Sequence, residues 1–159
     1  MLKWLWLSSL LIVLDQASKW FMVSWLSLYE TVAVIPFFNL TMAHNTGAAF
    51  SFLAQAGGWQ RWFFVGLTVI ISTGLIIWLK KLSAAAKLEA ISISMILGGA
   101  IGNVIDRLCH GYVIDFLDVY YGSYHWPTFN IADSAIVVGA ALLIIDSFMA
   151  TPAQTQEKK

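Results

Sequence analysis

The feature that most constrains this chain is a run of eighteen residues, Trp62–Leu79, without a charged side chain. A helix needs about 20 mainly apolar residues to cross the hydrocarbon core of a bilayer. Three more stretches approach that length, roughly Trp4–Leu26, Leu88–Leu108 and Ile131–Ala150. Charged residues make up only 11% of the chain, whereas soluble domains carry about 25%. The sequence therefore predicts an all-α integral membrane protein with four transmembrane helices in a single domain, residues 1–159.

The first apolar stretch follows Lys3 and could be mistaken for a secretory signal peptide. Asp15 and Lys19 interrupt it, however, and no Ala-x-Ala cleavage site follows. We therefore expect it to be retained as a membrane span. Its two charged side chains are the first indication of function, because a charge at mid-bilayer costs about 2.5–3.5 kcal/mol.

The lysines outside the apolar stretches fall in three places, at Lys3, within Lys80–Lys87, and at Lys158 and Lys159. With four spans, all three places lie on one side of the membrane, as the positive-inside rule requires. Both termini are therefore predicted to be cytoplasmic, with residues 151–159 as a polar tail. The two long loops, about 27–61 and 109–130, are predicted to face outward.

A fifth span over Thr31–Gln60 is the alternative, because this segment also lacks charge. It would place the middle and C-terminal lysines on the opposite side from Lys3, and it contains breakers such as Pro36. Thr31–Thr41 is instead rich in β-branched and aromatic residues. That composition predicts short strands at the membrane surface.

Polar residues inside the predicted spans suggest two kinds of role. Asp15 and Lys19 are four residues apart and share a helix face, which fits either an internal ion pair or a role near a substrate. Gly98 and Gly102 have the same spacing, which favours close helix packing.

Asn103, Asp106 and Arg107 form one stripe near the outer end of the third span. We interpret Asp106 and Arg107 as members of a structural network in which Arg107 bridges carboxylates. Such a network would be costly to break, because removing one partner leaves a buried charge unpaired.

Two further carboxylates, Asp115 and Asp133, lie in the second outer loop and at the start of the fourth span. Asn130 is placed to cap that helix, which puts Asp133 at the third helical position, where the dipole favours a carboxylate. Helix capping for Asp133 and a solvated loop position for Asp115 are therefore open alternatives. If the two meet, they share one proton and supply both a base and an acid, as water-mediated peptide hydrolysis requires.

Other chemistries have weaker support in the sequence. The histidines are scattered and no His-Glu-x-x-His motif occurs, so we expect neither a metal nor a cofactor. No basic stripe indicates nucleic-acid binding. The single cysteine, Cys109, is predicted to be a small buried residue. The main alternative to an enzyme is a small ion or proton transporter that uses Asp15, Lys19 and Arg107, and a purely structural scaffold is the third option.

Four blocks in order resemble the signature of the lipoprotein signal peptidases. They are DQASK at Asp15–Lys19, NTGAAFS at Asn45–Ser51, GGAIGNVIDRLCHGYVIDF at Gly98–Phe116, and WPTFNIAD at Trp126–Asp133. The third and fourth blocks are long and specific. The resemblance implies four helices with a small extracytoplasmic β-cradle from the first outer loop.

The resemblance also implies an activity and a site. The family removes the signal peptide from prolipoproteins after a diacylglyceryl group has been added, and it cuts before the lipidated cysteine at the outer face of the bacterial cytoplasmic (inner) membrane. Lipid-modified prolipoproteins, membrane lipids and globomycin-like inhibitors are therefore the expected partners. Asp115 and Asp133 match the catalytic aspartyl pair. The positions expected to support the site or hold substrate are Asp15, Lys19, Asn45, Gly47, Asn103, Arg107 and Asn130.

Overall fold

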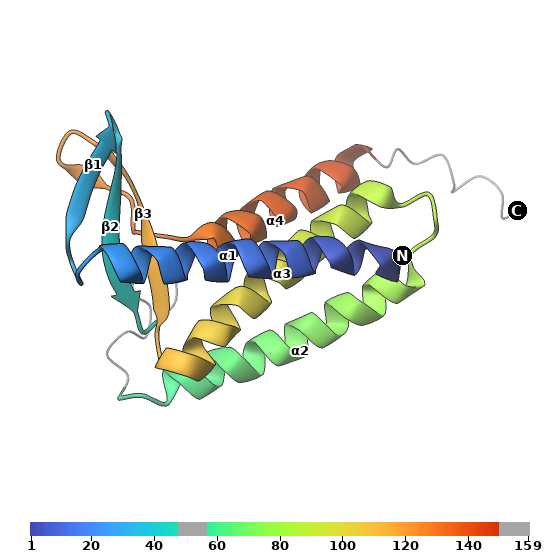
Figure 1. Ribbon diagram of the computed structural model, residues 1–159. Coiled ribbons are helices and arrows are strands. Elements are labelled where there is room, and N and C mark those ends of the chain that lie inside the picture. Colours follow the sequence, from blue (N-terminus) through green and yellow to red (C-terminus); the bar gives the residue numbers. More distant parts are fainter. Residues whose placement is uncertain (48–56, 150–159) are drawn as a thin grey trace, which may run out of the picture.

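A computed structural model describes residues 1–47 and 57–149 of the chain, in which long helices lie side by side and a small antiparallel sheet covers one end (Figure 1). The N-terminus lies at the opposite end of the bundle. The predicted tail at 151–159 lies outside the described residues. The helices are η1 (Leu2–Trp4), α1 (Leu5–Trp25), α2 (Gln60–Lys81), α3 (Lys87–His110) and α4 (Ile131–Met149), and the strands are β1 (Thr31–Ile35), β2 (Phe38–Asn45), β3 (Val113–Tyr121) and β4 (Tyr124–His125).

Three of the helices, α2, α3 and α4, are long and apolar enough to cross a membrane. The first helix, α1, has 21 residues but is not among them. The polar side chains of Asp15, Gln16 and Lys19 lie in its second half and lower its hydropathy. The structure therefore supports three of the four predicted spans by length and composition.

Helix α3 packs against α1, α2 and α4 and carries most of the buried side chains of the bundle. Its glycines allow this close packing. A Cβ atom on Gly98 would lie 2.9 Å from the Ser8 carbonyl oxygen, and one on Gly102 would lie 2.6 Å from Oδ2 of Asp15. The predicted packing role of these two glycines is confirmed.

The sheet has the order β1-β2-β3-β4, with antiparallel neighbours. The strands expected within Thr31–Thr41 are present. The sheet does not come from the first outer loop alone, however, because β3 comes from the second loop and pairs Asp115 with Ala43 of β2. Asp115 is therefore a strand residue with 1% of its surface exposed, which excludes the alternative that it is a solvated loop acid. The β-branched and aromatic residues of Val113–Tyr121 fit this pairing.

An apolar cluster joins the end of α1 to the sheet and so fixes the sheet on the bundle. Its buried members are Met22, Leu26, Met42, Ile114 and Phe116.

Cys109 differs from its prediction. It lies in the last turn of α3 and is exposed, not buried. The buried face of this turn is occupied by Asp106 and Arg107, which leaves Cys109 on the outer side of the helix.

Candidate active site

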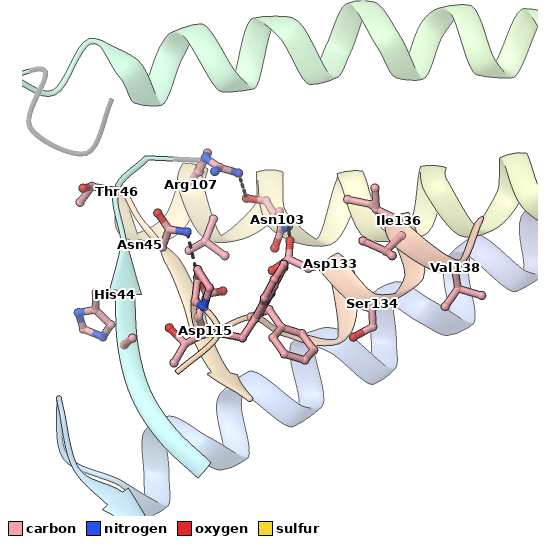
Figure 2. A pocket seen from close by; sticks show the side chains of 17 residues that line it. His44, Asn45, Thr46, Asn103, Arg107, Asp115, Asp133, Ser134, Ile136 and Val138 are labelled. Carbon is pink, nitrogen blue, oxygen red and sulfur yellow. Dashed lines mark hydrogen bonds between the residues drawn. The ribbon is translucent and has the colours of Figure 1, made fainter. Parts of the chain in front are cut away.

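A pocket of about 900 Å³ opens where the sheet meets α3 and α4 (Figure 2). The end of β2, the start of β3 and the segment Trp126–Phe129 form one part of its wall. Apolar side chains of α4 extend the wall along the helix at Ile136, Val137 and Val138. Asp115 and Asp133 both line this pocket, as do Asn103 and Arg107. The structure therefore brings the two predicted acids into one cavity that has a polar end and an apolar flank.

Asp115 is held by two amide donors. Asn45 Nδ2 donates to its Oδ2 at 3.1 Å, and Asn130 Nδ2 donates to its Oδ1 at 2.7 Å. Burial and the nearby charge of Asp133 outweigh these hydrogen bonds and raise the pKa of Asp115 from 3.8 to about 7. At neutral pH this carboxyl is therefore poised between its two protonation states.

Asp133 lies in the first turn of α4, where it forms a reciprocal cap with Asn130. The Asp133 backbone N–H donates to Asn130 Oδ1 at 2.8 Å, and the Asn130 backbone N–H donates to Asp133 Oδ2 at 3.3 Å. The predicted capping arrangement is confirmed. The cap leaves Asp133 Oδ1 to accept a 2.7 Å hydrogen bond from Asn103 Nδ2, so this side chain caps the helix and also lines the pocket.

Asn103 and Asn130 connect the two acids. Asn130 Nδ2 lies 3.1 Å from Asn103 Oδ1 as well as 2.7 Å from Asp115 Oδ1. Asn130 is fully buried, so it supports the acids from behind and does not line the pocket. The NH₂ group of each side chain faces acceptor oxygens, and its oxygen faces an N–H donor. These contacts determine the orientation of both amides.

Arg107 acts through the backbone in this structure. Its Nη2 donates to the Gly47 carbonyl oxygen at 2.8 Å, and its Nη1 lies 3.4 Å from the Asn103 carbonyl oxygen. The Gly47 N–H in turn donates to Asn45 Oδ1 at 3.0 Å. The hydrogen bonds of Arg107 within residues 1–47 and 57–149 therefore go to carbonyl oxygens, and the expectation that it bridges carboxylates was wrong. A planar guanidinium with several donors can hold a loop backbone in this way.

Asp15 and Lys19 lie behind the pocket and do not line it. Lys19 Nζ is 2.8 Å from Asp15 Oδ2, with both side chains at most 2% exposed. Of the two roles left open, the ion pair is the one that this geometry supports. Lys19 also reaches Asp106 Oδ2 at 2.8 Å and Asn103 Oδ1 at 3.0 Å.

Comparison with known proteins shows the family to which the chain belongs. A family model described as Signal peptidase (SPase) II matches residues 7–149. The chain belongs to the signal peptidase II family. A lipoprotein signal peptidase of Alteromonas mediterranea is 58% identical over 147 residues, which cover 92% of this chain and 81% of that protein. A lipoprotein signal peptidase of Photorhabdus laumondii is 53% identical over 154 residues, which cover 97% and 92%.

Two solved structures of bacterial membrane enzymes have the same fold. One superposes with a TM-score of 0.84 at 30% identity and covers 100% of this chain and 95% of that one. The other has a TM-score of 0.80 at 32% identity and covers 95% and 96%. Membership of the signal peptidase II family shows that the chain is a peptidase. Its similarity to these two structures indicates a bacterial membrane protein. The comparisons give no support to the transporter alternative.

Some residues in and around this candidate site were missed at the level of sequence. Gln16 Nε2 donates to Asp106 Oδ1 at 2.8 Å and lies 3.2 Å from both Asp15 Oδ2 and the Gly102 carbonyl oxygen. Its place within the DQASK block, beside Asp15, was the available signal. The pocket wall at Trp126–Phe129 lay within the WPTFNIAD block, but only its final Asn and Asp had been assigned a role.

Asp118 was also missed, and it anchors the strand that leads into this wall. Its carboxylate accepts hydrogen bonds from Asn39, Thr41 and His125, which tie β4 to β2. Burial alone would raise the pKa of Asp118, but these hydrogen bonds outweigh it and lower the pKa. The β4 strand is thus fixed just before the pocket wall begins.

His44 lines the rim of the pocket but points away from Asp115 (Figure 2). It stacks on Tyr112 with ring centroids 3.9 Å apart. Within residues 1–47 and 57–149, no three His, Cys, Asp or Glu side chains are grouped as metal ligands. The polar end of the pocket holds the acid pair with its amide donors.

Proposed function

We propose that this chain is a membrane aspartyl endopeptidase that removes the signal peptide from diacylglyceryl-modified prolipoproteins and cuts before the lipidated cysteine. The observation that carries the proposal is the pair of carboxylates, Asp115 and Asp133, in one pocket with a shared amide support. Relatives that are 53–58% identical over nearly the whole chain and are named lipoprotein signal peptidases support the substrate class.

In the proposed mechanism, the pair shares one proton. Asp133 lies at the N-terminal end of α4, where the helix dipole favours the ionised form, and it is the base that takes a proton from water. Asp115 holds the proton and donates it to the scissile carbonyl oxygen as the water oxygen bonds to the carbonyl carbon. The C–N bond then breaks, the leaving amine takes the proton from Asp133, and the new carboxyl group returns a proton to Asp115.

The apolar flank of the pocket supports a lipidated substrate. Ile136, Val137 and Val138 of α4 line it, and Val137 is 66% exposed. Val137 and its neighbours lie on a helix that is apolar enough to cross the membrane, so acyl chains placed against them would stay in a hydrocarbon environment. Globomycin-like inhibitors would compete for the same pocket.

The orientation in the membrane is part of the proposal. All four long helices cross the bilayer, both termini are cytoplasmic, and the site lies near the outer face of the bacterial cytoplasmic membrane. The charge distribution supports this orientation, because the N-terminus, which carries Lys3, and the loop between α2 and α3 lie at the end of the bundle opposite the sheet (Figure 1). The acid pair lies at the sheet end. In α1, the charge of Lys19 is paired, which lowers the cost of placing that helix in lipid.

The test is cleavage of a precursor by the purified protein in proteoliposomes. Wild type is expected to cleave a diacylglyceryl-modified prolipoprotein and to leave the unlipidated precursor intact. Asp115→Asn and Asp133→Asn are expected to insert and fold but to lose cleavage by at least about 100-fold, since each removes one of two acid–base groups. Full activity in either variant would reject the pair. Ion flux without cleavage in wild type would favour a transporter instead.

A further inference from the structure

Two buried carboxylates behind the pocket hold the backbone next to the two acids. Asp15 Oδ1 accepts the backbone N–H of Ala132 at 2.9 Å, and Ala132 directly precedes Asp133. Asp106 Oδ2 accepts the backbone N–H of Ile114 at 3.0 Å, and Ile114 directly precedes Asp115. Each acid of the pocket therefore has a buried carboxylate attached to the peptide N–H of the preceding residue.

One ammonium group joins these two carboxylates. Lys19 Nζ lies 2.8 Å from Asp15 Oδ2 and 2.8 Å from Asp106 Oδ2. The three side chains are at most 2% exposed. Lys19 also donates to Asn103 Oδ1 at 3.0 Å, and Asn103 Nδ2 donates to Asp133 at 2.7 Å. The chain of contacts from Asp115 through Ile114, Asp106, Lys19, Asp15 and Ala132 to Asp133 is continuous.

The stability of the fold does not by itself explain why Asp15, Lys19 and Asp106 are buried together. Buried ion pairs often contribute little net stability, because desolvation offsets their attraction. Two carboxylates around one ammonium also leave an excess negative charge, which Gln16 and the backbone N–H donors solvate. A charged group with directional contacts is well suited, however, to fixing the distance between two segments that are far apart in the sequence.

We propose that Asp15, Lys19 and Asp106 form a positioning triad that sets the separation of Asp115 and Asp133. The inference rests on the proposed function, in which these two acids act as a pair. None of the three residues of the triad lines the pocket. It acts through two peptide N–H groups and through the Asn103 amide. Without Lys19, Asp15 and Asp106 repel each other, and the backbone segments that they hold move apart.

The expected kinetic effect is on the chemical step. A displacement of about 1 Å in a catalytic group can lower the rate by about 100-fold. Substrate binding uses the pocket wall, of which the triad contacts Asn103 alone among the described lining residues, through Lys19. We therefore expect Lys19→Met to lower kcat by about 100-fold per folded enzyme, with KM changed less than about threefold. Lys19→Arg keeps the charge but presents a wider group, so we expect an intermediate loss of about tenfold.

The experiment measures kcat and KM over a range of pH for a lipidated precursor, with the folded fraction of each variant determined by size-exclusion chromatography and thermal melting. Lys87→Met is the matched control, because Lys87 is exposed at the first residue of α3, at the other end of that helix. It is expected to match wild type. Wild-type cleavage in the same assay tests the proposed function, so its failure is distinguishable from failure of the triad.

Three outcomes distinguish positioning of the two acids from other roles of the triad. A lower kcat at the optimal pH of each Lys19 variant, with KM unchanged, supports positioning. Unchanged kcat per folded enzyme with a lower melting temperature would mean that the triad only stabilises the fold. A shifted pH profile with wild-type kcat at its new optimum would mean that Lys19 acts by charge alone, and this also overturns the proposal. If Lys19→Met does not fold, the same measurements on Lys19→Arg test the proposal, with the same outcomes for and against it.

Discussion

The side-chain amide of Asn130 donates a 2.7 Å hydrogen bond to the carboxylate of Asp115. The oxygen of the same amide accepts the backbone N–H of Asp133 at 2.8 Å. One buried side chain therefore contacts both acids of the proposed pair, and it does so with opposite ends. Substitutions can remove the contact made by its NH₂ group and keep the contact made by its oxygen.

Asn130→Asp and Asn130→Ser are both expected to keep the helix cap, because each retains an oxygen that can accept from the Asp133 backbone. Asn130→Asp places a third carboxylate beside the pair and removes the donor to Asp115, so we expect its kcat to fall by at least about 100-fold. Asn130→Ser removes the donor without adding charge and should lose less. Steady-state cleavage kinetics of the two variants check this order, and equal losses would contradict it.

Cleavage is expected to decline as the pH rises above about 7. Burial and the charge of Asp133 raise the pKa of Asp115 to about 7, and Asp115 is the proposed proton donor. Activity on the alkaline side should therefore follow the protonated fraction of this carboxyl. Measurement of kcat/KM between about pH 5 and pH 9 checks the prediction, and a plateau up to the alkaline end of that range would exclude Asp115 as the donor.

Asp115→Asn is expected to stabilise the protein while abolishing cleavage. The pKa of Asp115 is higher in the folded than in the unfolded chain, so wild type loses stability as pH rises from about 4 to about 7. A difference of that size limits the gain to about 4 kcal/mol, and the amide donor left without an acceptor costs about 1–3 kcal/mol. The melting temperature should exceed that of wild type at pH 8, with this advantage absent at pH 4.

Gly102→Ala is expected to lower stability by about 1–3 kcal/mol, because its Cβ atom would lie 2.6 Å from Asp15 Oδ2 in a tightly bonded region. Gly74→Ala in α2 is the matched control. Outside its own turn of helix, no atom of the described residues lies within 4 Å of the corresponding Cβ position, so the substitution should be neutral or stabilise by up to about 1 kcal/mol. Thermal melting of both variants tests the difference. Equal melting temperatures would show that α1 can move away from α3 without cost.

The parts of this structure that follow from local rules were predictable from the sequence. The apolar runs located α2, α3 and α4, and the Asn130 to Asp133 spacing predicted the cap that the structure contains. The grouping of Asp115 and Asp133 was different, because spacing alone left structural and catalytic roles open for both. Family resemblance, and not local chemistry, brought them together before the fold was known.

Features that depend on long-range pairing were not predictable in the same way. Val113–Tyr121 lay in a segment taken for a loop, and it became a strand only through its partner β2, about 70 residues earlier in the chain. Arg107 was expected to meet carboxylates, but the fold brings the Gly47 carbonyl oxygen within 2.8 Å of it. In each case the partner, and not the residue itself, decided the outcome.

Helix α2 packs mainly on α3 and η1, and of its side chains only Gln60 and Leu79 are buried. Its outer turn is attached by Arg61, which donates to the Leu108 carbonyl oxygen, and by Phe64, which stacks under Arg107. No side chain of α2 lines the pocket. It contributes Leu79, which is buried in an apolar cluster with Ala90, Ile93 and Leu97 of α3, and it returns the chain to the end of the bundle from which α3 starts toward the acids. A foreign apolar helix of the same length that keeps Arg61, Phe64 and Leu79 should therefore be an acceptable replacement, and this makes the lipid-facing side of α2 a convenient place for labels or affinity tags.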